Sequence, residues 1–469
     1  MKMLISLFLF LSTIPCSHAQ TVPKLLGAPD IIPPATAEMQ HPEFWISRIN
    51  NPDRVIMTPE QIVAFNRKNR SRSLSRKDIR GNTVHVDSIV KGVVTFSGIS
   101  FHLSDPLRLR EYPGNLLTQH LSSIRDFIVK TELWDRRQIP FPESSKHELI
   151  ADMNMESIPG VIRPRYGVVV RHTLNRIVPT HVKVYQSQFN WLDAFQNAVL
   201  ETGMPVAILH SSKSGEWLCV KSEYSLGWVP AENIALGSES RIGPVSEPDN
   251  FVVGIVHKTP VYADRECGTW LTDIYMGERL ELDLKTDSAY RVTVPVRRPD
   301  GSLDTVPGWV KGDAGVNVGY QTYTQKNVIT TIFRLLNRPY GWGGTDHERD
   351  CVGTVRAVYR TFGIFMPRWT TYELYHTDHV IAFPADTPIE EKYRLLETCE
   401  PGITVCGFNW HVVLYLGKVG NINYVIHQNG FSYHDENGTE YRVGRVSVNN
   451  TELEGGADIH RWTELSVFK

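Results

Sequence analysis

The sequence has little of what several classes of protein need. Its 469 residues include only six cysteines, too few for a fold held together by disulfides. The formal net charge at pH 7 is −2, so overall charge predicts neither a nucleic acid nor an anionic membrane as partner. Beyond the first twenty residues, no apolar run is long enough to span a bilayer. The length predicts roughly three domains of ordinary globular composition.

Motifs for cofactors and metals are also missing. We find neither a glycine-rich phosphate loop nor a serine on the strand-to-helix turn that many hydrolases use. His376 and His379 are spaced as an H-x-x-H pair, but no cysteine or further histidine lies near enough in sequence to complete a zinc site. We therefore predict no metal and no cofactor, and chemistry carried by side chains.

The first 19 residues are typical of an export signal. Lys2 precedes an apolar run over residues 4–14, and Ser-His-Ala ends at Ala19. We predict cleavage after Ala19 and a protein of the periplasm or cell envelope without a transmembrane segment. Cys16 leaves a lipid anchor as an alternative, although Pro15 fits poorly before a lipidated cysteine.

Five cysteines remain after this cleavage, and outside the cytosol an odd number leaves at least one thiol free. Cys399 and Cys406 could pair, although spacing alone does not establish it. The five are Cys219, Cys267, Cys351, Cys399 and Cys406.

Four regions are expected after the signal. Residues 20–160 carry helix signals between long loops, with Thr58 as the N-cap of one helix. Residues 165–236 and 250–315 read as short strands and turns, each with a Gly-Trp-Val near its end. This repetition indicates two copies of one small β-barrel. Residues 320–469 mix helices and strands.

The stretch from Gly341 to Arg368 places a cysteine at the start of a helix. Asp350 is a suitable N-cap, which puts Cys351 in the first turn, where the helix dipole favours a reactive thiolate. The alternative is a buried structural cysteine. The helix is predicted from an apolar face at helical spacing, formed by Val355, Val358, Tyr359 and Phe362.

Two histidines are candidates for the base that a cysteine nucleophile needs. In an antiparallel hairpin with a five-residue loop, residues 417–421, Leu416 pairs with Ile422. His411 then lies directly opposite His427, so one imidazole can orient the other. The alternative is that the two histidines are unrelated.

With these residues in place, the last region resembles the NlpC family of bacterial cell-wall cysteine endopeptidases. The resemblance implies a papain-like α+β domain with Cys351 as nucleophile, His411 as general base and His427 as the orienting residue. Tyr340 and Asp350 match positions that line the site and help hold the amine end of the substrate. The matching segments are RPYGWGG, DCVG, AVYRTFGIFMPR, HVVLYLG and VIHQ.

The resemblance extends upstream and implies a multidomain architecture. Residues 193–217 are similar to the first bacterial Src-homology-3 domain of multidomain members, and residues 250–315 look like the second. The N-terminal region looks like the helical extension of the same architecture. Those members are exported hydrolases that cut γ-D-glutamyl–diamino acid bonds in peptidoglycan stem peptides. The implied substrates are stem peptides or muropeptides, and the first barrel is expected to close one end of the cleft.

Two departures from the family pattern concern specificity. Val352 stands where the family usually has serine, and Trp369 stands where it has a polar residue. They leave open an amidase or acyltransferase that uses the same Cys–His pair on another amide. A wall-binding protein with an inactive catalytic domain is a further alternative.

Overall fold

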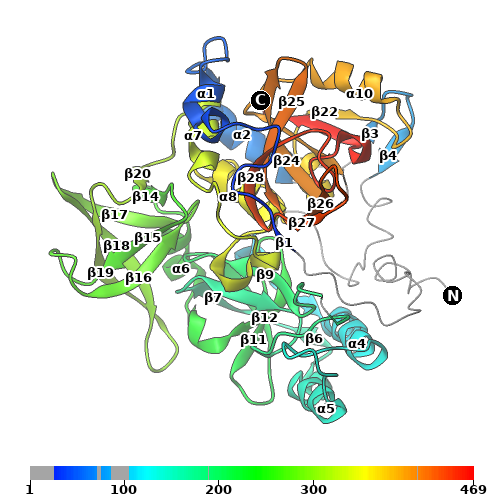
Figure 1. Ribbon diagram of the computed structural model, residues 1–469. Helices are drawn as coiled ribbons and strands as arrows, with labels where there is room; N and C mark the ends of the chain where they lie inside the picture. Colours follow the sequence, from blue (N-terminus) through cyan, green and yellow to red (C-terminus); the bar gives the residue numbers. More distant parts are fainter. Residues whose placement is uncertain (1–25, 71–74, 86–104, 189, 409) are drawn as a thin grey trace.

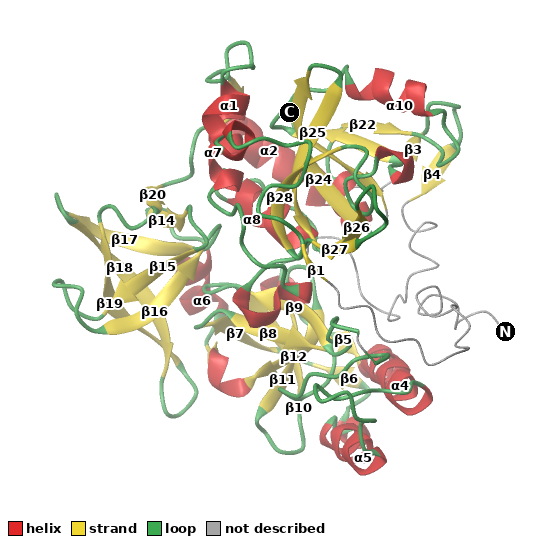
Figure 2. Ribbon diagram, in the orientation of Figure 1, coloured by secondary structure: helices red, strands yellow, loops and turns green. Residues whose placement is uncertain are grey.

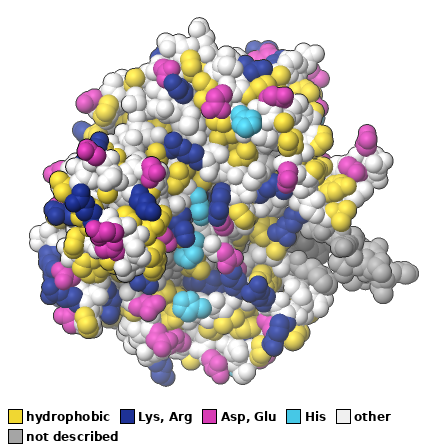
Figure 3. Space-filling model, turned by 60° about the vertical axis from the view of Figure 1, so that its left-hand side comes forward, with side chains coloured by type: hydrophobic (Ala, Val, Ile, Leu, Met, Phe, Trp, Pro, Cys, Tyr) yellow, Lys and Arg dark blue, Asp and Glu magenta, His cyan; other side chains and the backbone are white. Residues whose placement is uncertain are grey.

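The computed structural model describes residues 26–70, 75–85, 105–188, 190–408 and 410–469 (Figure 1). The predicted export signal lies outside these residues. Two β-rich domains and one α+β domain contact one another, and the strand-rich and mixed parts are distinguished in Figure 2. Acidic and basic side chains are interspersed over the face drawn in Figure 3. Among the described residues, none of the helices combines the length and the apolarity that crossing a membrane takes.

The first β domain is a seven-stranded sheet in the order β13-β7-β10-β11-β12-β8-β9. Its apolar core holds Val206, Ile208 and Val220 among others, and Trp228 is fully buried. Its strands are β7 (Arg165–Val169), β8 (Thr173–Arg176), β9 (Gln196–Leu200), β10 (Pro205–Ser211), β11 (Trp217–Lys221), β12 (Leu226–Pro230) and β13 (Ile234–Leu236).

The second β domain repeats this topology. Its sheet has the order β20-β14-β17-β18-β19-β15-β16, which is the order of the first sheet strand for strand. The Gly-Trp-Val sequences lie in the corresponding strands β12 and β19, so the repetition noted in the sequence reflects a structural repeat. Helix α6 (Glu239–Ser246) joins the domains. The strands are β14 (Phe251–Gly254), β15 (Lys258–Tyr262), β16 (Trp270–Tyr275), β17 (Arg279–Lys285), β18 (Ala289–Arg297), β19 (Leu303–Lys311) and β20 (Val316–Val318).

The third domain is built on a six-stranded antiparallel sheet in the order β22-β29-β23-β24-β25-β28. Helix α8 (Cys351–Arg360) packs on β24 (His411–Val419) and β25 (Ile422–Asn429). The other elements are β21 (Tyr323–Thr324), α7 (Gln325–Phe333), α9 (Thr370–Leu374), β22 (His379–Ala382), α10 (Ile389–Leu396), β23 (Thr404–Phe408), β26 (Ser432–His434), β27 (Glu440–Arg442), β28 (Arg445–Asn450) and β29 (Glu464–Val467).

The first N-terminal segment, residues 26–70, packs on this third domain. Strand β1 (Leu26–Gly27) pairs with β27, and β2 (Val55–Met57) pairs with β21. Trp45 of α1 (Pro42–Ile46) is buried with its ring 5.5 Å from that of Tyr424. Helix α2 (Pro59–Arg70) begins with the predicted capping box, since the Thr58 N–H donates to Gln61 Oε1 over 2.7 Å.

Residues 105–162 pack instead on the first β domain. Apolar side chains of helix α4 (Gly114–Lys130), such as Leu117 and Ile124, share one core with Trp217 and Trp228. The region expected to form one extension therefore contacts two different domains. Its remaining elements are α5 (Glu143–Asp152), β5 (Tyr112–Pro113) and β6 (Val161–Ile162), and the short strands β3 (Ser75–Lys77) and β4 (Thr83–His85) pair with each other.

Candidate active site

Cys351 is the first residue of α8, as the sequence predicted. The Asp350 carboxylate caps this helix by accepting the Gly353 backbone N–H over 2.8 Å. The four apolar residues that predicted the helix are all buried. The Cys351 side chain is itself only 6% exposed. All five cysteines of the described part of the chain are free, so Cys399 and Cys406 do not pair.

The pKa of Cys351 differs from the expectation for a helix start. Burial and, to a smaller extent, the neighbouring negative charge of Asp350 raise the pKa of the thiol to about 12. A hydrogen bond from the backbone N–H of Val412 opposes this rise but does not reverse it. Desolvation therefore outweighs the helix dipole, and the resting form is the thiol.

The two histidines lie on the predicted hairpin, but the predicted register is wrong. The strands are joined by a two-residue turn at Gly420 and Asn421, and Leu414 rather than residue 412 lies opposite Ile426. Gly420 has φ +59°, which allows this tight turn. Continued by one residue, the same register would place Val413 opposite His427. A shift of two residues keeps a side chain on its face of the sheet, so His411 becomes a diagonal neighbour of His427.

A direct contact joins the two imidazoles. His411 Nε2 lies 2.6 Å from His427 Nδ1, and the ring centroids are 4.9 Å apart. His427 Nε2 lies 2.8 Å from Asn449 Oδ1, which can only accept a hydrogen bond. The network thus assigns the proton of His427 to Nε2, so His427 Nδ1 accepts from His411 Nε2–H. His411 Nδ1 is then left as an acceptor.

Asn449 is the residue of this network that sequence reasoning missed. Its Oδ1 also accepts from Ser447 Oγ over 2.7 Å, and both residues are on β28 beside β25. Ser447 and Asn449 alternate with Val446 and Val448 along the strand. Two polar residues that alternate with two valines, and so lie on one face of the strand, were the available signal.

Both histidines are neutral at pH 7. Burial lowers the pKa of His411 well below its ordinary value, and the nearby His427 and Arg461 lower it further. Burial lowers the pKa of His427 to about 4. The His411 ring meets the ring of Phe431 edge to face at 5.0 Å and packs against the backbone of Gly456.

Tyr340 and Asp350 lie beside the thiol. Burial raises the pKa of Tyr340, as do the nearby Cys351 and Asp350, so its hydroxyl lies near both. Asp350 Oδ2 accepts the Gly343 N–H over 3.0 Å and forms an ion pair with Arg368. The charge expected to hold an ammonium group is therefore already compensated.

The two departures from the family pattern have different surroundings. Val352 is 3% exposed and belongs to the apolar core of the third domain. It therefore faces away from solvent. Trp369 is partly buried and packs against the same core.

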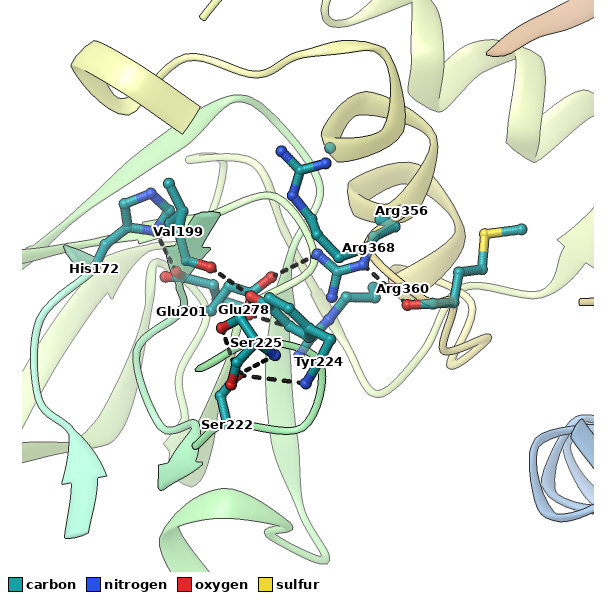
Figure 4. A network of polar contacts seen from close by, with 12 residues as sticks. His172, Val199, Glu201, Ser222, Tyr224, Ser225, Glu278, Arg356, Arg360 and Arg368 are labelled. Carbon is teal, nitrogen blue, oxygen red and sulfur yellow. Dashed lines mark hydrogen bonds and ion pairs between the residues drawn. The ribbon is translucent and has the colours of Figure 1, made fainter. Parts of the chain in front are cut away.

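The first β domain reaches the helix that carries Cys351. Glu201 lies 3.5 Å from Arg356 and 3.3 Å from Arg360, both on α8, and accepts the Tyr224 hydroxyl over 2.8 Å (Figure 4). The Tyr340 ring meets Trp191, which precedes β9, at 5.2 Å. These contacts hold the two domains together beside the site.

No group of three or more His, Cys, Asp or Glu side chains in the described ranges is arranged to hold a metal ion.

Comparisons with known proteins match this architecture. The model of an SH3 domain of the SH3b1 type matches residues 190–230. A solved NlpC/P60 endopeptidase from Photobacterium damselae subsp. piscicida superposes with a TM-score of 0.69 at 19% identity, covering 90% of this chain and 96% of that one. An NlpC/P60 family protein from Bacillus cereus gives a TM-score of 0.45 at 16% identity, covering 64% of this chain and 98% of that one. A search of curated proteins found no match.

The chain is thus a multidomain α+β protein with an SH3b domain and an NlpC/P60 endopeptidase-like fold.

Proposed function

We propose that this protein is an exported cysteine peptidase that hydrolyses γ-D-glutamyl–diamino acid bonds in peptidoglycan stem peptides. The observation that carries the proposal is the chain of polar contacts from His411 through His427 to Asn449, together with a cysteine at a helix start. The thiol of this cysteine accepts a hydrogen bond from the backbone N–H of Val412, the residue after His411. The fold shared with an NlpC/P60 endopeptidase supports it. The SH3b match supports a cell-wall substrate, since such domains accompany wall hydrolases in the family that the sequence resembles.

The proposed mechanism is acyl transfer. His411 Nδ1 takes the proton of Cys351, and the sulfur attacks the carbonyl carbon of the scissile amide. Backbone N–H groups at the start of α8 stabilise the oxyanion that forms. The imidazolium of His411 then protonates the leaving amine, and water hydrolyses the thioester. His427 holds the His411 ring in the tautomer that these reaction steps need.

The first β domain is proposed to shape one end of the cleft. Its Glu201 contacts Arg356 of α8, and its Trp191 contacts Tyr340, which precedes that helix. Docking of this kind restricts the substrate to short or flexible peptides. We propose that the second β domain, which has the same topology, is also of the SH3b kind.

The test is mass spectrometry of purified muropeptides incubated with the protein. We expect products cut between the glutamyl and the diamino acid residue, and none with Cys351→Ala. Cleavage at a different amide would support the amidase alternative. A folded wild-type protein that binds muropeptides without cutting them would support the wall-binding alternative and refute our proposal.

A further inference from the structure

A small cavity lies where the three domains meet, beside the start of α8. The first β domain contributes Glu201 to its wall and the second contributes Tyr275. The third domain contributes most of the lining, including Arg349 and Asp350, the two residues directly before Cys351. Cys351 itself is not part of the lining, but Asp350 is, and the charge of Asp350 raises the pKa of the Cys351 thiol. The cavity wall thus lies within one residue of the cysteine.

The carboxylates in the cavity wall already have partners. Glu201 is paired with Arg356 and Arg360, and it also accepts the Tyr224 hydroxyl (Figure 4). Glu348, which also lines the cavity, forms an ion pair with Arg338, a residue that does not line it.

Asp350 is satisfied in the same way. Arg368 compensates its charge, and its two oxygens accept the backbone N–H groups of Gly343 and Gly353. None of these three carboxylates is left to hold an ammonium group.

Arg349 differs from the other arginines of the wall. Its guanidinium lies 2.9 Å from the Nδ1 atom of His257 and donates to the His257 carbonyl oxygen over 3.4 Å. Within the described residues it forms no ion pair. Burial lowers its pKa to about 10, although the carboxylates of Glu278 and Glu201 partly oppose this. A guanidinium presents five donors, so donors remain for a further acceptor.

We propose that Arg349 binds a carboxylate of the substrate, namely the α-carboxylate that a γ-linked glutamyl residue leaves free. The inference rests on the proposed function. In a γ-glutamyl amide the side-chain carboxyl forms the bond, so a negative charge remains on the acyl side. An ordinary α-linked peptide has no such charge there. Arg349 would thus distinguish the γ linkage by charge, with the bidentate geometry that guanidinium and carboxylate share.

The competing explanation is that Arg349 only clamps the third domain to the second β domain through His257. Arg338 provides the matched control, because its guanidinium lies 3.0 Å from the Nε2 atom of the same imidazole but does not line the cavity. Removing a clamp would affect every substrate alike, whereas removing a carboxylate receptor would affect only substrates with that carboxylate.

The experiment compares L-alanyl-γ-D-glutamyl-diamino acid with the same peptide carrying an α-carboxamide on the glutamyl residue. We expect wild-type kcat/KM to be higher for the acid by about tenfold to a hundredfold, the factor for a hydrogen bond to a charged group. Arg349→Gln should lower kcat/KM for the acid by that factor and change it little for the amide. Arg338→Gln should preserve the wild-type ratio.

Equal losses on both peptides in Arg349→Gln, or no preference in the wild type, would overturn the proposal. If the wild type cleaves neither peptide, the proposed function fails. Calorimetric binding of the two peptides to Cys351→Ala then still decides the matter, since a preference for the acid that Arg349→Gln removes supports the receptor and equal binding rejects it. Thermal melting of each variant checks that it is folded.

Discussion

Gly456 packs so closely on His411 that its replacement by alanine tests the catalytic role of that ring. A Cβ built at Gly456 would lie 2.3 Å from His411 Cδ2 and 2.4 Å from Nε2. Non-bonded carbon atoms pack best at about 3.5–4.0 Å, so either the His411 ring or the loop that carries Gly456 must move by about 1 Å. Nε2 is the atom that contacts His427, so moving the ring breaks the 2.6 Å contact that orients it.

We expect Gly456→Ala to lower kcat by about a hundredfold, because a misplacement of about 1 Å in a catalytic group costs about that much. The overpacking should destabilise the fold by only about 1–3 kcal/mol. The assay measures release of the diamino acid from the γ-glutamyl peptide, with melting curves to confirm folding.

Gly243→Ala is the control, since a Cβ there meets nothing within 4 Å. It should keep wild-type activity. If Gly456→Ala is folded and retains kcat within about threefold of wild type, the argument that the His411 ring must hold its position is refuted.

Four further predictions follow from the site. His411→Ala should abolish hydrolysis as completely as Cys351→Ala, whereas His427→Gln should be milder because an orienting residue needs only one hydrogen bond; equal losses in all three would contradict these roles. Asn449→Asp should move the acidic limb of the kcat/KM profile to higher pH, because a carboxylate beside His427 raises the pKa of the imidazole pair; an unmoved limb would count against the network. N-acetylation of the peptide should change kcat/KM by less than about threefold, since Asp350 is compensated, and a larger loss would restore an ammonium-binding role. Alkylation of Cys351 by iodoacetamide, followed by peptide mapping, should accelerate steadily from pH 7 to about 10, and a rate already at its plateau at pH 7 would indicate a preformed thiolate.

The start of α8 was predictable because its determinants are local. The Asp350 cap, the position of Cys351 and the apolar face all act within a few residues of one another, and each is found in the structure. The capping box at Thr58 is a second example. Such features depend on backbone groups close in sequence and need no knowledge of the tertiary fold.

The register of the histidine hairpin was not determined locally. Gly420-Asn421 is a signal for a two-residue hairpin turn, which favours this turn over a five-residue loop. The bulge between Tyr415 and Gly417, which sets the register at the histidines, has no such local signal. The predicted contact between His411 and His427 is nevertheless present, because the predicted and the observed registers differ by an even number of residues. An odd difference would have placed the rings on opposite faces.

Long-range packing was beyond sequence reasoning. The pairing of β2 with β21 joins residues 55–57 to 323–324, and Glu201 reaches the arginines of α8 across a domain boundary. The hydrophobic periodicity of a sequence does not predict which distant residues pair in this way. The compensation of Asp350 by Arg368 belongs to the same class, and it changes the expected chemistry of the site.

The same limit explains the pKa of Cys351 and what it means for catalysis. A helix start lowers the pKa of an exposed thiol, but the burial that raises it here is created by residues distant in sequence, among them those of β24. The pKa of the thiol is raised and that of His411 is lowered, so at rest the proton stays on sulfur. We expect the ionised pair to form as substrate binds and backbone N–H groups stabilise the developing oxyanion. A site organised in this way keeps an inert thiol until an amide is in place, which would suit the exported enzyme that we propose, since such an enzyme is exposed to oxidants.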